Sequence, residues 1–159
     1  ILSGDWTNNS AFTSGTGTVT FDGNTPSTIR GSTTFHHLSC VTFGKAITFE
    51  AGSVQTIEAG ATWNFKGNEV GLRRIFLRST VPGSLWYINP QGGIDLDYLD
   101  VQDSVNLRAD PLNPENSYNS GNNTNWFTIK KWRYTISGRY MPVATDIYGA
   151  IPVDHLTRR

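Results

Sequence analysis

The sequence predicts an all-β domain whose first two thirds form a parallel β-solenoid. Three observations lead to this prediction. Strand-length segments of alternating apolar and polar residues recur through the first hundred residues. Turn sequences that contain glycine separate these segments every 8–12 residues. One strand pattern and one corner sequence are each used more than once, as expected of stacked turns that reuse the same corner chemistry.

The alternating segments are too short for helices and have the two-residue period of strands. They are GTVTF (17–21), TTFHHL (33–38), CVTF (40–43), AITFE (46–50), SVQTIE (53–58), ATWNF (61–65), RIFLRS (74–79), SLWYIN (84–89) and IDLDYLDV (94–101). The turns between them are DGN (22–24), FGK (43–45), EAG (50–52 and 58–60), KGN (66–68), VPG (81–83) and PQGG (90–93). Glycine makes positive φ accessible at such turns.

Repetition within the segments favours a solenoid over a sandwich or a barrel. E-A-G occurs twice with a repeat distance of 8 residues, and V-T-F at 19–21 and 41–43 is followed by the similar I-T-F at 47–49. We expect the two apolar residues of each such triplet to point inward and the threonine to point outward. The apolar residues expected to line one continuous interior in the E-A-G region are Phe49, Val54, Ile57, Trp63 and Phe65.

The succession GTGTVTFDG, TIRGSTTFHHL, ITFEAGSVQTIEAGATWNFKG and IFLRSTVPGSLWYINPQGGIDLDYLDVQDS resembles the right-handed parallel β-helix repeats of large bacterial surface proteins, many of them adhesin-like. The resemblance covers about residues 11–106. It implies an exported β-helix with an adhesive or scaffolding role, and it implies no catalytic residues.

The composition divides the chain into three parts. Residues 1–107 form the predicted β-solenoid domain, and residues 108–125, rich in proline, asparagine and serine, are expected to be a loop or linker. Residues 126–159 form an aromatic, basic tail of strands and loops with six basic and two acidic residues. The tail therefore has a net charge of +4, against −4 for residues 1–129.

Several functional classes are disfavoured by composition. The 159 residues include 13 basic and 13 acidic side chains, so no overall field attracts nucleic acid. No apolar run is long enough to span a bilayer. The single cysteine, Cys40, is expected to be a buried thiol, and the three histidines are not spaced as a metal site, so we expect no metal and no cofactor. A start at Ile1 is expected of a processed or excised piece of a longer protein.

Two pairs of residues are candidate ligand-binding groups. Asp95 and Asp97 share one face of a strand by the two-residue period, and such carboxylates suit acid/base hydrolysis or cation binding. The alternative is a solvated strand face that keeps the surface soluble. Trp63 and Trp86 are candidates for stacking on sugar rings, and the alternative for each is a place in the core.

The tail is the candidate surface for self-association. A tail strand donated to a neighbouring copy would form a heterologous interface that can propagate into a filament. The alternative is a tail that folds back as the cap of its own solenoid. The residues expected at the interface are Trp126, Phe127, Trp132, Arg133, Tyr134 and Tyr140.

The sequence thus predicts a non-catalytic structural or adhesive subunit of a bacterial cell-surface or extracellular assembly, self-associating end to end. One alternative is a carbohydrate-binding or polysaccharide-degrading β-helix module, which is the only enzymatic function the sequence suggests. Another is a fragment of a viral fibre, because trimeric fibres also use β-helices.

Overall fold

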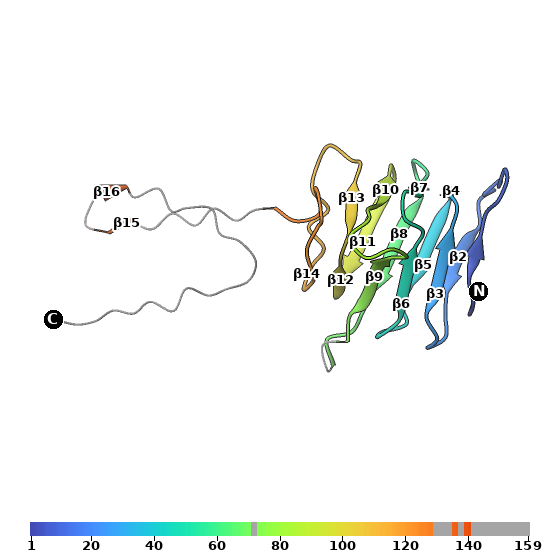
Figure 1. The fold of residues 1–159 in the computed structure, drawn as a ribbon, viewed down its shortest axis with the longest axis horizontal. Helices are drawn as coiled ribbons and strands as arrows, with labels where there is room; N and C mark the ends of the chain where they lie inside the picture. The colour runs from blue at the N-terminus through green and yellow to red at the C-terminus, as the bar shows by residue number, and fades with distance from the viewer. Residues whose placement is uncertain (71–72, 129–134, 137–138, 141–159) are drawn as a thin grey trace. The chain divides into compact units, whose positions relative to one another are not determined.

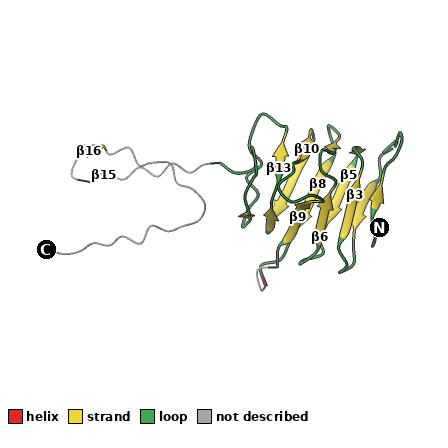
Figure 2. Ribbon diagram, viewed as in Figure 1, coloured by secondary structure: helices red, strands yellow, loops and turns green. Residues whose placement is uncertain are grey.

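The computed structural model describes residues 1–70, 73–128, 135–136 and 139–140 (Figure 1). The chain divides into two compact units, Ile1–Thr128 and Ile129–Arg159. Apart from Val70, which has 3₁₀ conformation, the described residues of the first unit form strands, turns and loops (Figure 2). In the second unit, Thr135–Ile136 (β15) and Arg139–Tyr140 (β16) pair antiparallel. No helix in the described part of the chain is long and apolar enough to cross a membrane.

The first unit consists of three sheets. Sheet 1 contains β2 (Thr18–Phe21), β5 (His37–Cys40), β8 (Thr62–Lys66) and β11 (Gly93–Asp97). Sheet 2 contains β1 (Trp6–Thr7), β3 (Ser27–Arg30), β6 (Ala46–Phe49), β9 (Ile75–Ser79), β12 (Leu99–Val101) and β14 (Tyr118–Asn119). Sheet 3 contains β4 (Thr33–Phe35), β7 (Val54–Ile57), β10 (Trp86–Pro90) and β13 (Ser104–Asn106).

Every strand pairing in these sheets is parallel, which confirms the predicted all-β class with parallel sheets. From β2 to β13 the chain visits sheets 1, 2 and 3 in turn, so each strand pairs with the strand three places later. Figure 1 shows the strands of each sheet side by side in this order, for example β4, β7, β10 and β13 in sheet 3. The arrangement is compatible with the predicted parallel β-helix.

Alternate side chains of the strands point between the sheets and form the core. Phe49, Ile57, Trp63 and Phe65 are fully buried, as predicted from their two-residue spacing. The prediction for Val54 is wrong, because Val54 lies three residues before the inward Ile57 and the two-residue period of a strand therefore places it on the outer face. Gln55, two residues before Ile57, is buried instead. The Gln55 amide nitrogen donates to the Gly31 carbonyl at 3.0 Å, and the Ser53 hydroxyl lies 3.1 Å from the same nitrogen.

The V-T-F triplet at 41–43 is a corner and not a strand. Strand β5 ends at Cys40, and the Lys45 amide then donates to the Thr42 carbonyl at 3.3 Å. Consequently Val41 and Phe43 are exposed, contrary to the prediction that both point inward. The Arg73 guanidinium carbon lies 5.5 Å from the centre of the Phe43 ring and covers part of it.

The two E-A-G sequences form two successive corners, as the repeat predicts. The Ser53 amide donates to the Glu50 carbonyl at 3.1 Å, and the Ala61 amide donates to the Glu58 carbonyl at 3.2 Å. The glycines between them have φ of 79° and 81°, a left-handed conformation that glycine adopts without steric cost.

Lys45 is fully buried, and its ammonium group stabilises the corner that follows β2. It donates to the Asp22, Gly23 and Thr25 carbonyls at 3.1, 3.1 and 2.7 Å. Burial lowers the pKa of Lys45 and raises the pKa of Cys40, whose thiol is buried as the sequence predicts. The fold therefore binds one ammonium group through backbone carbonyls alone.

The segment 108–125 is mostly loop, one of the two alternatives that its composition predicts, and it is packed within the first compact unit. Tyr118–Asn119 pairs with β12, and Leu112 is buried, so this segment belongs to the first compact unit. Its asparagine side chains replace strand hydrogen bonds: the Asn123 carboxamide accepts from the Ser104 amide at 3.1 Å and donates to the Val101 carbonyl at 2.7 Å.

Trp126 closes the core at this end of the unit. Its fully buried ring packs edge-on against Trp63 and Trp86, with centroid distances of 5.7 and 5.9 Å. Its Nε1 donates to the Ser104 hydroxyl at 2.8 Å. The prediction that Trp126 serves self-association is therefore wrong, because its side chain is part of its own core.

We expect Trp126→Ala to destabilise the protein by about 3–5 kcal/mol, since it removes a buried ring and its hydrogen bond and leaves a cavity. Urea denaturation followed by circular dichroism measures the change. Tyr118→Ala, at an exposed aromatic, is the control and should stay within about 0.5 kcal/mol of wild type. Equal stabilities of the two variants would contradict the closing role of Trp126.

Candidate functional site

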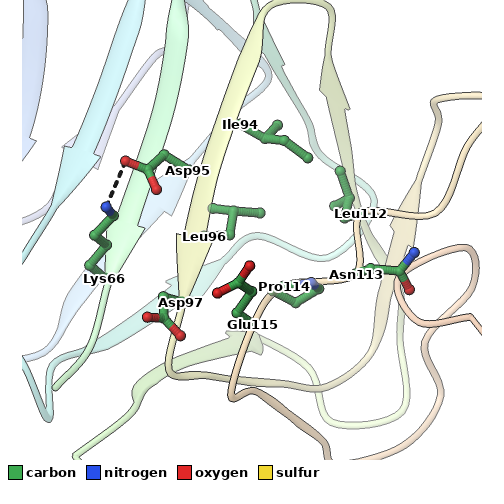
Figure 3. Close-up of a pocket in the computed structure, with 9 residues that line it drawn as sticks. All are labelled: Lys66, Ile94, Asp95, Leu96, Asp97, Leu112, Asn113, Pro114 and Glu115. Carbon is green, nitrogen blue, oxygen red and sulfur yellow. Dashed lines mark ion pairs between the residues drawn. The ribbon is translucent and has the colours of Figure 1, made fainter. Parts of the chain in front are cut away.

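A hollow of about 270 Å³ lies beside β11, the last strand of sheet 1 (Figure 3). One wall is β11 with one residue of β8, and the other is the loop that precedes β14. The lining residues are Lys66, Ile94, Asp95, Leu96, Asp97, Leu112, Asn113, Pro114 and Glu115.

The hollow exists because sheet 1 ends there. Ile94 continues an inward row of side chains in sheet 1, opposite Trp63, yet 37% of its surface is exposed, whereas Trp63 is fully buried. Leu112 lies across from it and covers it only in part, as Figure 3 shows. An apolar side chain in a core position is thus left open to solvent.

The backbone edge of β11 is also incompletely paired. The Gly93 amide and the Asp97 carbonyl form hydrogen bonds on the β8 side of the strand. The backbone N–H and C=O groups of Ile94, Leu96 and Tyr98 therefore point away from β8. On that side the Glu115 amide donates to the Leu96 carbonyl at 3.1 Å, and the Glu115 carbonyl accepts from the Tyr98 amide at 3.0 Å. Between Leu96 and the start of the strand, Ile94 has no pairing strand among the described residues.

Three carboxylates and one ammonium group surround the hollow. Asp95 forms an ion pair with Lys66 at 2.7 Å, and both side chains are about half exposed (Figure 3). Asp97 and Glu115 lie further along the rim, where their backbones form a parallel bridge. The local charge is therefore negative and attracts cations. Because these carboxylates are exposed, each ion pair that they form with a cation is weak.

Asp97 holds the loop wall in place. Its Oδ1 accepts from the Tyr98 amide and from the Asn116 carboxamide, both at 2.9 Å. Tyr98 has φ of 49°, which turns the chain from sheet 1 into sheet 2. Burial raises the pKa of the Tyr98 phenol, and the carboxylates of Glu69 and Asp97 raise it further.

The arrangement suits a long side chain with an apolar stem and a positive end. Ile94, Leu96, Leu112 and Pro114 provide apolar contact, and the carboxylates of the rim provide the charge. The part of the chain that the structure describes contains no group of three or more His, Cys, Asp or Glu placed to hold a metal ion.

The structure brings only one predicted pair of ligand-binding residues to a common surface. Asp95 and Asp97 both lie on the outer face of β11 at the hollow, as the two-residue period predicts. Trp63 and Trp86 are fully buried in the core, so neither ring presents a face to a sugar, and the predicted stacking surface is corrected accordingly. Trp86 stacks instead on Phe49, with ring centroids 3.8 Å apart.

The residues predicted for self-association fall into two groups. Trp126 is in the core, and Phe127 is partly buried against it. Tyr140 lies in β16, but its side chain, like the whole of Trp132, Arg133 and Tyr134, is outside the described residues.

Sequence reasoning missed the second wall of the hollow. Leu112 and Glu115 stand in a segment without periodicity, so no pattern indicated that they would lie beside Asp95. It also missed an exposed aromatic column on sheet 2, where Phe76 and Tyr118 lie on either side of Asp100. Their exposed fractions are 36% and 55%.

Comparison of the chain with protein-family models, curated proteins and solved structures gave no match.

We expect Asp97→Ala to loosen the loop wall and to destabilise the protein by about 1 kcal/mol, because two hydrogen bonds to a carboxylate are lost. Hydrogen exchange should show faster exchange of the Tyr98 and Glu115 amides than in wild type. Asp110→Ala removes an exposed carboxylate nearby and is the control. Unchanged exchange at both amides in Asp97→Ala would contradict the assigned role.

Proposed function

We propose that the protein is a non-catalytic structural subunit of an extracellular or cell-surface assembly, built on a right-handed parallel β-helix and associating with other copies of itself. The fold part of the proposal is supported by the strand order, in which three parallel sheets are visited in turn. Its handedness and its extracellular setting are supported by the resemblance to bacterial surface repeats.

The observation that carries self-association is the unfinished edge of sheet 1. The last strand of sheet 3, β13, is paired along its whole length, because the Thr124 amide donates to the Ser104 carbonyl at 2.8 Å and the Thr124 carbonyl accepts from the Asn106 amide at 3.1 Å. Sheet 2 is extended by β14. Beyond β11, only the bridge between Asp97 and Glu115 extends sheet 1 in the described residues. A free strand edge beside an apolar hollow is a surface that other chains can pair with.

The other end of the unit is covered by its own N-terminal segment. Leu2 bridges to Phe21 at the edge of sheet 1, and β1 pairs with β3 at the edge of sheet 2. Trp6 packs against Phe35, with ring centroids 5.2 Å apart. We therefore propose contact at the β11 edge, in place of the end-to-end stacking that the sequence predicts.

We expect the full chain to sediment as concentration-dependent oligomers, and a chain that ends at Thr128 to sediment as a monomer. Analytical ultracentrifugation and electron microscopy measure this, and circular dichroism checks that the shortened chain keeps its strands. The cut follows Thr128 because Trp126 belongs to the core. A monomeric full chain at all concentrations would overturn the proposal.

A second candidate function is carbohydrate binding on the outer face of sheet 2. Phe76 and Tyr118 are exposed there, and the Arg78 guanidinium donates to the Asp100 carboxylate at 2.8 Å between them. The Ser120 hydroxyl also donates to that carboxylate, at 2.5 Å. Exposed rings beside hydrogen-bonding groups of fixed orientation are suited to sugars.

If this face binds a glycan, Phe76→Ala and Tyr118→Ala should each lower the affinity about tenfold, as loss of an aromatic anchor does. A glycan array followed by calorimetry on any hit measures the effect. Phe43→Ala, at an exposed ring on a corner, is the control. No binding on the array would leave the structural role alone.

A further inference from the structure

We infer that the hollow beside β11 binds a lysine or arginine side chain from residues 129–133 of a second copy. This inference rests on the proposed self-association and names the site and the segment that produce it.

The size of the hollow selects a side chain over a separate small molecule. Pockets for drug-sized ligands usually measure about 300–1,000 Å³ and enclose most of the ligand. The hollow measures about 270 Å³ and is open on one side, with the exposed Ile94 in it. A long side chain that enters from a neighbouring molecule would cover Ile94 and complete the row of inward side chains that ends there.

The chemistry of the hollow selects a cationic side chain. Aliphatic stems of lysine and arginine bury well along apolar surface while their charged ends stay near water. Here the stem would lie on Ile94, Leu112 and Pro114, and the charge would reach the carboxylates of Asp95 and Glu115. Lys45 shows that this fold can hold an ammonium group on backbone carbonyls, and Ile94 belongs to the part of the β11 edge that has no pairing strand among the described residues.

Charge complementarity identifies the partner segment. The first compact unit is net negative, whereas residues 126–159 carry +4, and Lys130, Lys131 and Arg133 are concentrated just beyond that unit. The sequence there, IKKWR, also supplies apolar residues next to the charges. A second copy of the chain therefore offers the chemistry that the hollow requires, and the resulting contact joins two different surfaces.

The test exchanges the charges of the two surfaces in the full chain. Asp95→Lys with Glu115→Lys makes the rim of the hollow basic, and Lys130→Glu with Lys131→Glu makes the segment acidic. Each double variant alone should associate at least about tenfold more weakly than wild type, because like charges then meet. A mixture of the two should associate again, because the basic hollow of one meets the acidic segment of the other.

Asp110→Lys is the matched control, since it reverses an exposed charge close in sequence to the loop wall. It should associate as wild type does, and circular dichroism verifies that every variant is folded. The wild-type association should also weaken as salt is raised from about 0.05 to 0.5 M.

Two outcomes overturn the inference and are distinguishable. If wild type is monomeric, both the inference and the proposed function fail. If wild type associates but the double variants associate equally well, or if mixing does not restore association, the proposed function stands and this site is wrong. Loss of association in the hollow variant alone, without rescue, is a case of the second outcome, because the hollow would then bind a different segment of the second copy.

Discussion

The packing of Trp126 between Trp63 and Trp86 is the interaction on which the C-terminal half of the unit depends. The three rings come from segments far apart in sequence and meet at the end of the core. After β13 the chain continues in the same direction, pairing with sheet 1 at Glu115, with sheet 2 at β14 and with sheet 3 at Thr124, before Trp126 enters the core. The hollow is therefore a consequence of how the core is closed.

Buried polar groups at the corners determine where each strand begins. Lys45 fixes the corner after β2 with three backbone hydrogen bonds, and Gln55 fixes the chain at Gly31. A buried ammonium or carboxamide without such partners would be costly, so these contacts also specify the register of the strands around them. Gln55 shares the inward face of β7 with Ile57, so the burial of Ile57 and the hydrogen bond of Gln55 favour the same register.

The sequence predicts the strands better than it predicts which of their faces is buried. Most alternating segments are strands, and both E-A-G corners are found, because alternation and positive φ are local properties. The V-T-F triplet at 41–43 has the same local pattern but lies at a corner, since Cys40 already ends the inward row. For segment 108–125 the sequence predicts only a loop or linker and not its packing on β12 and β13, because side-chain hydrogen bonds of asparagine leave no periodicity in a sequence.

The candidate site was predictable on one wall only. Asp95 and Asp97 follow from the two-residue period of β11, whereas Glu115 reaches them through one bridge from a segment without periodicity. The edge of sheet 1 stays open because, after β12 and β13, the chain pairs with β11 only once, through Glu115, and then continues to β14 in sheet 2. Among the described residues, sheet 1 receives no further strand. A surface that a chain leaves unpaired while it closes its own core is the surface on which another copy can bind without disturbing the fold.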